Sequence, residues 1–328
     1  MPSSSVYKTL RLMTGACLGD THEIDPCAMT GSATGTPEGR EPFDRLLGEL
    51  RPKLHRYCAR MTGSVIDAED VVQEATVKAL EAFPGTGPIA NVEGWLFRIA
   101  HNAALDHLRR RARLDAAHVV EDIDMIPDPG MSAEGRHTAA ASLQTFMRLP
   151  AAQRSSVILM DVLGYTIEEI GNIIDSSVPA VKAALHRGRL RLREVSGEPD
   201  DRPVPVLAEP ERARLAAYVE RFNARDFDAI RDMLAEDVRL DLVNRFRASG
   251  RTKVGRYFHN YAGIHDWRLL PGLVDRHPAI LVIDPDDSAG GLKYFILLEW
   301  AGDRLARIRD FRYARYTLDG AEVVPLRA

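Results

Sequence analysis

The hydrophobic pattern is clearest between Leu149 and Glu194, where apolar residues recur at helical spacing and predict three short consecutive helices. The second, at about residues 166–174, buries a stripe of isoleucines, and Thr166 with Glu169 three positions later forms a capping box. A polar Asp-Ser-Ser turn follows, in which a serine caps the third helix. Helix, tight turn and helix in this order predict a helix-turn-helix.

The third predicted helix carries two different stripes. Its apolar stripe consists of Val178, Val181, Leu185 and Leu192. Its polar stripe consists of Lys182, His186, Arg189 and Arg193, and the helix also carries Arg187 and Arg191 but no acidic residue up to position 193. A helix with one face docked and the other positive fits the major groove of DNA between its phosphates. The alternative is an ordinary amphipathic helix with a solvated basic face.

Three further helices are predicted ahead of this segment. An apolar stripe at positions 43–57 indicates the first, which Pro52 is expected to kink or break. The second, at 67–83, has a polar and mostly acidic first half: Asp67, Glu69, Asp70, Gln73 and Glu74. After a loop at 84–90, Asn91 caps the third helix, which ends in Arg109, Arg110, Arg111 and Arg113.

The charges at these helix ends have an ordinary interpretation. Acidic residues near the start of a helix and basic residues near its end both suit the helix dipole, which explains most of the acidic run. Four arginines within five residues exceed what a helix end needs, and they indicate contacts to phosphates.

A polar, proline-containing hinge at 197–210 separates these helices from a different pattern. Residues 213–235 predict two helices. Alternating segments at 238–242, 278–284, 292–300 and 305–316 then predict strands, with a short helix at 254–261. Helices followed by strands predict an α+β domain with a curved antiparallel sheet at 211–328.

Length and composition place this pattern in a multidomain globular protein. The chain has 328 residues, 45% hydrophobic and 27% charged, so two or three domains are expected. Residues 1–40 are rich in Ser, Thr, Gly and Pro, which predicts a disordered extension. Residues 114–141 form an acidic linker, whose plain interpretation is a solvated connection. Since the net charge is −4, binding to nucleic acid requires local basic patches.

The sequence predicts a cytoplasmic protein without a metal. No apolar run approaches the roughly 18 residues that span a bilayer, and the first residues lack the apolar core of a signal peptide. Cys17, Cys27 and Cys58 lack metal-site spacing, and Cys17-His22-Cys27 is a poor candidate. We expect no cofactor, no metal ligand and no membrane partner.

Two motif blocks resemble one known family. The sequence DAEDVVQE from Asp67, followed by WLFRIAHNAALDHLRR from Trp95, resembles region 2 of extracytoplasmic-function (ECF) sigma factors. LPAAQR from Leu149 and VKAALHRGR from Val181 resemble region 4. The blocks, at 41–113 and 142–196, occur in the family's order. The resemblance implies two all-α domains, with core RNA polymerase and promoter DNA as partners.

The resemblance also implies roles for particular positions. The helix matching Asp70, Gln73 and Glu74 docks on the polymerase, and the loop at 84–90 holds a base flipped out of the −10 element. Positions beside the opened −10 strand are Asn102, Asp106, Arg109, Arg110 and Arg113, while Trp95 suits either this surface or the core. Positions at the −35 element are Lys182, His186, Arg187, Arg189 and Arg193. Pro179-Ala180 replaces the usual Gly-Thr or Gly-Ser pair, which puts the −35 base preference in question.

The C-terminal segments FNARDFDAIRDMLAEDVRLDL and IRDFRYARY resemble a SnoaL-like cone, the fold of polyketide cyclases and nuclear-transport-factor-like domains. Such a cone has a pocket, which raises the hypothesis of an enzyme. The candidate acid–base residues are Asp241, His265, Asp266, His277 and Asp310, but no pair of them has diagnostic spacing. A regulatory domain that contacts regions 2 and 4 is the preferred interpretation, with or without a small-molecule ligand.

We therefore predict an ECF-type sigma factor that directs transcription initiation and performs no catalysis itself. One alternative is a free-standing helix-turn-helix regulator of duplex DNA, which leaves the acidic helix at 67–83 without a partner. The other is a SnoaL-like enzyme that its N-terminal half brings to DNA.

Overall fold

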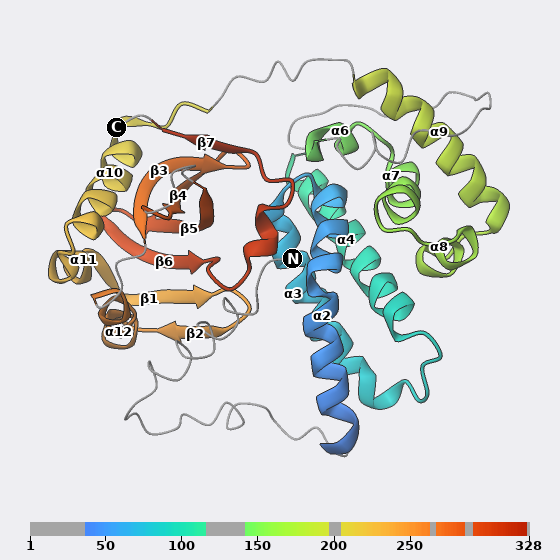
Figure 1. Cartoon of the computed structure of the whole chain (residues 1–328), viewed down its shortest axis with the longest axis horizontal. Coiled ribbons are helices and arrows are strands. Elements are labelled where there is room, and N and C mark those ends of the chain that lie inside the picture. The colour runs from blue at the N-terminus through green and yellow to red at the C-terminus, as the bar shows by residue number, and fades with distance from the viewer. Residues whose placement is uncertain (1–36, 116–141, 197–204, 263–266, 286–290, 327–328) are drawn as a thin grey trace.

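The computed structural model of the chain describes residues 37–115, 142–196, 205–262, 267–285 and 291–326 (Figure 1). Expectations for the rest of the chain, including most of the N-terminal extension, the acidic linker and the hinge, lie outside these residues. The same holds for Cys17, His22, Cys27, His265 and Asp266. The described residues form two helical blocks and a C-terminal domain that contains a sheet.

The first block contains α2 (Pro37–Thr62), α3 (Val65–Ala82), the short η2 (Phe83–Gly85) and α4 (Val92–Asp115). The side chains of Ser64 and Asn91 accept backbone hydrogen bonds at the starts of α3 and α4, as a cap should. The three long helices enclose a core around Tyr57, Met61 and Phe97, which are fully buried.

The predicted break at Pro52 is wrong, because α2 continues through it. The proline removes one backbone donor, which would have bonded to the carbonyl of Gly48. Its ring is exposed, whereas Leu47, Leu54 and Tyr57 on the opposite side are buried. Packing of that apolar face therefore outweighs the local cost of the proline.

The second block contains α6 (Leu143–Met147), α7 (Ala151–Val157), the π-helical turn η3 (Ile158–Val162), α8 (Ile167–Ile174) and α9 (Val178–Ser196). The predicted capping box of Thr166 and Glu169 starts α8, and Ser177 caps α9. Gly188 lies where α9 packs on α7, since a Cβ at this glycine would stand 2.7 Å from Cγ2 of Val157. The helix-turn-helix is confirmed, with α9 as its last helix.

The C-terminal domain begins with α10 (Glu209–Asn223) and α11 (Phe227–Met233). Strands β1 (Leu234–Leu242) and β2 (Phe246–Ser249) precede α12 (Arg251–Ala262). They are followed by β3 (Arg268–Val274), β4 (His277–Ile283), β5 (Leu292–Ala301), β6 (Arg304–Asp310), the short η4 (Arg315–Leu318) and β7 (Val323–Pro325). The strands form one sheet in the order β2-β1-β6-β5-β4-β3-β7, which confirms the α+β plan.

Three details of the predicted sheet need correction. The sheet is mixed, because β1 and β6 run parallel while the other described pairs are antiparallel. Strands β2, β3 and β7 were not predicted. The strand expected to reach Tyr316 ends at Asp310, and the chain then turns into η4. Alternating residues alone cannot distinguish a parallel neighbour from an antiparallel one.

The sheet lies between two sets of helices (Figure 1). Ile280, Val282, Ile296 and Ile308 belong to a core shared with α10, α11 and α12. The alternate residues Leu281, Phe295, Leu297 and Phe311 belong to a different core, shared with α2 and α3 of the first block. Because successive strand residues face opposite sides, one sheet serves both its own domain and the helical block.

Candidate functional site

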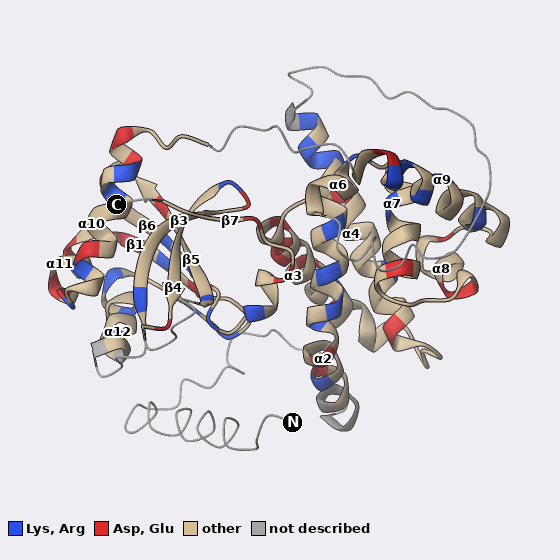
Figure 2. Cartoon of the chain, turned by 45° about the horizontal axis from the view of Figure 1, so that its top comes forward, with Lys and Arg blue, Asp and Glu red and all other residues tan. Residues whose placement is uncertain are grey.

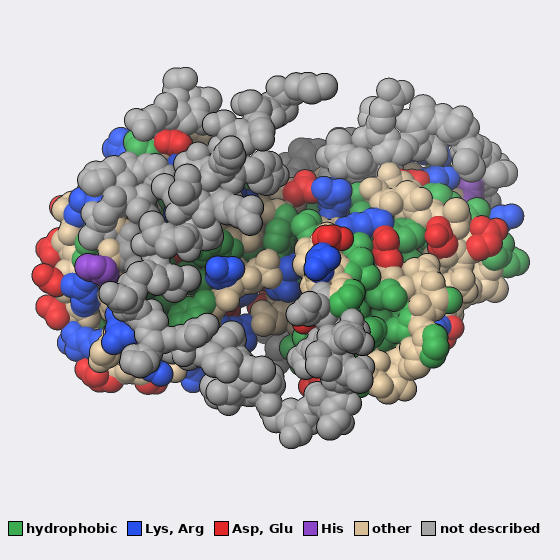
Figure 3. All heavy atoms as spheres, turned by 60° about the horizontal axis from the view of Figure 1, so that its bottom comes forward, with side chains coloured by type: hydrophobic (Ala, Val, Ile, Leu, Met, Phe, Trp, Pro, Cys, Tyr) green, Lys and Arg blue, Asp and Glu red, His purple; other side chains and the backbone are tan. Residues whose placement is uncertain are grey.

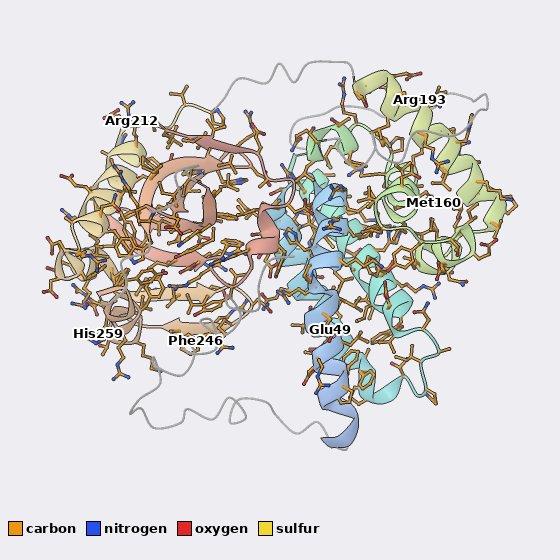
Figure 4. All side chains as sticks on the ribbon, viewed as in Figure 1. Glu49, Met160, Arg193, Arg212, Phe246 and His259 are labelled. Carbon is orange, nitrogen blue, oxygen red and sulfur yellow. The ribbon has the colours of Figure 1, made fainter. Side chains whose placement is uncertain are left out.

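The basic residues of α9 differ in how exposed they are. Lys182, Arg191 and Arg193 are exposed, whereas His186 and Arg187 are half-buried. Figure 4 labels Arg193 on the upper part of α9, in the second block. Figure 2 shows lysines and arginines on both α4 and α9. Both signs of charge are interspersed on the face seen in Figure 3, so the basic surfaces are local, as the net charge of −4 requires.

Arg189 has an intramolecular partner that the sequence did not reveal. Its Nε and Nη2 donate to the two carboxylate oxygens of Asp161, over 2.9 and 2.5 Å. The side chains of Arg189 and Asp161 are only 14% and 4% exposed. Asp161 lies in the π-helical turn η3, so this bidentate pair ties α9 to the segment that follows α7.

The predicted −10 surface lies along the second half of α4. Asn102, Arg109, Arg110 and Arg113 are exposed, and Asp106 accepts a hydrogen bond from Arg109 over 3.0 Å. The loop at 84–90 is mostly exposed as well. Trp95 packs beside Phe43, with ring centroids 6.2 Å apart, so part of its surface belongs to the core.

Two arginines of α4 also pair with the acidic helix α3. Arg110 donates to Glu74 over 2.8 Å, and Arg111 donates to Asp67 over 3.0 Å. The hydrogen bond from Arg110, together with Lys78, holds the pKa of the Glu74 carboxyl below its usual value. The two groups therefore stay charged and paired at neutral pH.

The third acidic position on α3 is paired across the domain boundary. Arg309, on β6, donates to both oxygens of Asp70, over 2.6 and 3.3 Å. The side chain of Arg309 is 6% exposed, and that of Asp70 is 56% exposed. Gln73 is half-buried beside this pair on the same helix. In Figure 2, α3, with its acidic residues coloured red, lies between the sheet and the other helices.

A buried cluster reinforces this boundary. Glu69, which is 1% exposed, forms an ion pair with Arg51 of α2 and accepts from the Tyr316 hydroxyl over 3.0 Å. Arg51 also donates to that hydroxyl over 2.8 Å. Burial raises the pKa of Glu69, and the charge and hydrogen bond of Arg51 oppose this rise. Tyr316 thus joins the C-terminal domain to both α2 and α3.

The start of α3 makes a further contact with the C-terminal domain. Asp275 accepts from the backbone N–H groups of Val65, over 2.5 Å, and Glu322, over 2.9 Å. A carboxylate at this end of a helix is favoured by the helix dipole. Arg56 of α2 also pairs with Asp319 over 2.7 Å. The C-terminal domain therefore makes the expected contact with the first helical block. It also approaches the second block, because Gly320 lies near Leu143.

The described acid–base candidates have separate surroundings. Asp241 lies near Arg247 and Arg307, at 3.4 and 4.0 Å. The Nδ1 of His277 lies 2.9 Å from the backbone carbonyl of Asp275. Asp310 is fully buried and accepts from Tyr257 and Tyr261 instead. Within the described ranges no group of three His, Cys, Asp or Glu side chains suits a metal ion.

Sequence reasoning missed Arg309, Tyr316, Arg51 and Asp275. Glu69 stood in the noted acidic run, but its partners lie on another helix and in another domain. Arg309 and Tyr316 lie within the segment IRDFRYARY, yet nothing in its spacing indicates which face of the sheet is covered. An arginine alternating with apolar residues on a strand was the available signal.

Comparisons with known proteins agree with the division into two helical blocks. The family models described as Sigma-70 region 2 and Sigma-70, region 4 match residues 46–114 and 143–192. These two matches define the class of sigma-70-type transcription factors. The ECF RNA polymerase sigma factor SigM of Mycobacterium tuberculosis is 34% identical over 161 residues, which cover 48% of this chain and 79% of that protein. The chain belongs to the family of ECF RNA polymerase sigma factors.

Two further matches cover different shares of the chain. The ECF RNA polymerase sigma factor SigE of Mycolicibacterium smegmatis is 32% identical over 166 residues, covering 49% of this chain and 64% of that protein. The chain thus spans less than two thirds of that relative's length. The solved structure of the M. tuberculosis extracytoplasmic function sigma factor SigJ covers 82% of this chain and 95% of that chain, at 17% identity and a TM-score of 0.33. In the part of the chain that the structure describes, no helix has the length and apolarity to cross a membrane.

Proposed function

We propose that this protein is a sigma factor that binds core RNA polymerase and directs it to promoters. The observation that carries this proposal is the pairing of an acidic helix and a basic helix-turn-helix in two blocks that match sigma regions 2 and 4. The protein acts in the cytoplasm, where its partners are the polymerase and promoter DNA. It performs no chemistry itself and needs no cofactor.

Binding at the −35 element relies on α9. Lys182, Arg187 and Arg193 contact the DNA, with His186 on the same stripe. The bidentate pair with Asp161 gives Arg189 a positioning role, because it holds the helix against its support. Phosphate contacts supply most of the affinity and make it dependent on salt. Pro179-Ala180 at the start of α9 alters which bases are read.

Opening of the −10 element relies on α4 and the loop at 84–90. A base flipped from the stack loses a few kcal/mol of stacking, which a protein pocket must offset. The exposed loop supplies that pocket. Asn102 and Asp106 line the single strand, and Arg109, Arg110 and Arg113 contact its phosphates.

Docking on the polymerase relies on Asp70, Gln73 and Glu74 of α3. Asp70 is held by Arg309, and Glu74 by Arg110. The C-terminal domain therefore competes with the polymerase for the acidic helix. This competition is how the fused domain tunes transcription.

Transcription in vitro with core polymerase tests both parts of the proposal. Lysines in place of Asp70 and Glu74 should abolish polymerase binding and RNA synthesis, since they reverse the charge of the docking helix. Unchanged binding would remove the docking claim. A protein that binds promoter DNA but never core polymerase would instead be a free-standing helix-turn-helix regulator.

Arg309→Ala should tighten binding to core polymerase. The Asp70 carboxylate is 56% exposed, so its pair contributes about 1 kcal/mol, which corresponds to about fivefold in affinity. Arg307→Ala is the matched control, because Arg307 lies two residues away on β6 and pairs with Glu299 over 3.2 Å. Equal affinities of the two variants for the polymerase would contradict the competition.

A further inference from the structure

Four arginines share one face of the sheet where β2, β1 and β6 lie side by side at its edge (Figure 1). Strand pairing places Arg239 of β1 opposite Arg307 of β6. Two positions further along β1, Asp241 lies opposite Arg247 of β2 on one side and Arg309 of β6 on the other. The alternate residues of these strands belong to the core shared with α10–α12, so the arginines lie on the face turned away from those helices.

Three of these arginines are open to solvent. Arg239 is exposed, and the side chains of Arg247 and Arg307 are 60% and 37% exposed. The strand-paired positions of this face carry only two carboxylates. Asp241 lies 3.4 Å from Arg247 and 4.0 Å from Arg307, and Glu299 of β5 pairs with Arg307 over 3.2 Å. Positive charge is therefore in excess on this face.

The charge of Arg239 is the least compensated. Among the described residues, its guanidinium has no hydrogen-bond or ion-pair partner. Its neighbours on the adjoining strands are Arg307 and Ser249, so one neighbour repels it and the other is neutral. Like charges that lie opposite each other on neighbouring strands destabilise a sheet. An anion bound between Arg239 and Arg307 would remove this repulsion.

The arrangement suits an extended anion better than a small one. Neighbouring strands are about 4.8 Å apart, so the distance across the strands from Arg247 to Arg307 is about 10 Å. One strand of DNA carries about three phosphates over that length. Guanidinium groups bind phosphate oxygens through two parallel hydrogen bonds, and the hydroxyl of Ser249 is a further donor on this face.

We propose that this face of β2, β1 and β6 binds the phosphate backbone of DNA through Arg239, Arg247 and Arg307. The proposal rests on the proposed function, in which DNA is the anion that α4 and α9 bind. The three arginines hold the DNA and read no bases, because phosphates carry no sequence information. The C-terminal domain thereby adds affinity outside the −10 and −35 contacts.

The salt dependence of DNA binding by the full chain tests the proposal. Arg239→Ala combined with Arg247→Ala should lower the slope of log K against log salt for duplex DNA by about 1.8, since each lost phosphate contact removes about 0.9. The matched control combines Arg212→Ala with Arg256→Ala, which removes the same charge from exposed positions on α10 and α12. The control should keep the slope of the unchanged chain.

The form of DNA that binds is distinguished by two probes, a duplex of random sequence and one of its single strands. A single strand should lose a slope of about 1.4 with the two substitutions, because each contact there releases fewer counterions. An effect confined to the duplex assigns the face to double-stranded DNA, and an effect confined to the single strand assigns it to the opened strand. Equal slopes for the double variant and the control on both probes would overturn the proposal.

A second pair of variants separates DNA contact from misfolding. Arg239→Ala breaks no ion pair, so its Tm should match that of the unchanged chain while its slope for duplex DNA falls by about 0.9. Arg239→Lys keeps the positive charge and should keep the slope. A slope lowered equally by both substitutions would contradict a charge contact.

Two further outcomes decide between this proposal and its alternatives. An unchanged slope for the double variant, together with weaker binding to core polymerase, would assign the face to an acidic protein surface and would overturn the DNA contact. A full chain that binds neither probe nor promoter DNA would overturn the proposed function as well. A full chain that binds DNA with the same slope in every variant refutes the contact on this face alone.

Discussion

At the scale of single residues, two arginines on the same helical stripe have different environments. Arg189 and Arg193 lie on one stripe of α9, four positions apart, and the sequence gives no reason to separate them. The structure does, because Asp161 accepts from Nε and Nη2 of Arg189 in a nearly buried pair, whereas Arg193 is exposed. A helical stripe indicates a common direction, but the depth of each side chain depends on the neighbouring helix.

Replacing Arg189 by alanine should therefore affect stability, whereas replacing Lys182 by alanine should affect the salt dependence of DNA binding. Arg189→Ala leaves Asp161 buried without a partner and should lower the free energy of unfolding by about 3 kcal/mol. Lys182 is exposed, so Lys182→Ala should leave the Tm unchanged and reduce the slope of log K against log salt by about 0.9. Salt titrations of promoter binding and thermal unfolding of both variants measure this. A slope lowered equally by both changes would restore Arg189 to the phosphate contacts.

At the scale of elements, the helices were more predictable than the strands. Amphipathic periodicity, the capping box at Thr166 and the Asn91 cap are local signals, and each is present in the structure. Strand β3 was missed because Pro271 and Gly272 interrupt its pattern, and β2 and β7 have only four and three residues. The continuous α2 shows the reverse error, where a strong local signal at Pro52 is overruled by packing.

Two helical glycines give a matched test of close helix packing. A Cβ at position 188 would stand 2.7 Å from Val157 Cγ2 and 3.2 Å from the Gln153 carbonyl, so Gly188→Ala should push α9 from α7. The expected cost is about 1–3 kcal/mol of stability, with weaker DNA binding. Gly48 has nothing within 4 Å of an added Cβ, and Gly48→Ala should stabilise α2 by about 0.5–1 kcal/mol. Denaturant unfolding of both variants decides, and a neutral Gly188→Ala would disprove the close contact.

At the scale of the whole molecule, the C-terminal domain is part of the first block's core rather than an attachment to it. Phe295, Leu297 and Phe311 of the sheet share a buried cluster with Tyr57 and Val72 of the helices. The sequence analysis predicted a regulatory C-terminal domain in contact with the helical blocks. This prediction came from the resemblance to known families. The candidate site residues could be proposed from the sequence because they lie in local motifs. The partners of Asp70 and Glu69 could not, because pairing between residues more than 200 positions apart leaves no periodic trace.

A chain that ends at residue 196 should therefore be less stable than the full chain. Loss of the C-terminal domain exposes the apolar face of α2 and α3 and leaves Glu69 with only Arg51 as a partner. The Tm should therefore fall, and aggregation should increase. Differential scanning calorimetry and light scattering of the two chains measure both effects. An unchanged Tm would show that the first block folds independently, and only then does a change in transcription by the short chain report regulation alone.

Strand β6 carries Arg309 and Asp310 side by side, and they face opposite layers of the protein. A slip of this strand by one residue in one direction would set the Asp310 carboxylate against that of Asp70. A slip in the other direction would bury the Arg309 guanidinium among tyrosines and leave Ile308 opposite Asp70. Charge thus locks the register of β6 in addition to the alternation of apolar residues. The protein should consequently tolerate neither an insertion nor a deletion within β6, because a shift in one direction would turn the attraction between the two halves into repulsion and a shift in the other would remove it.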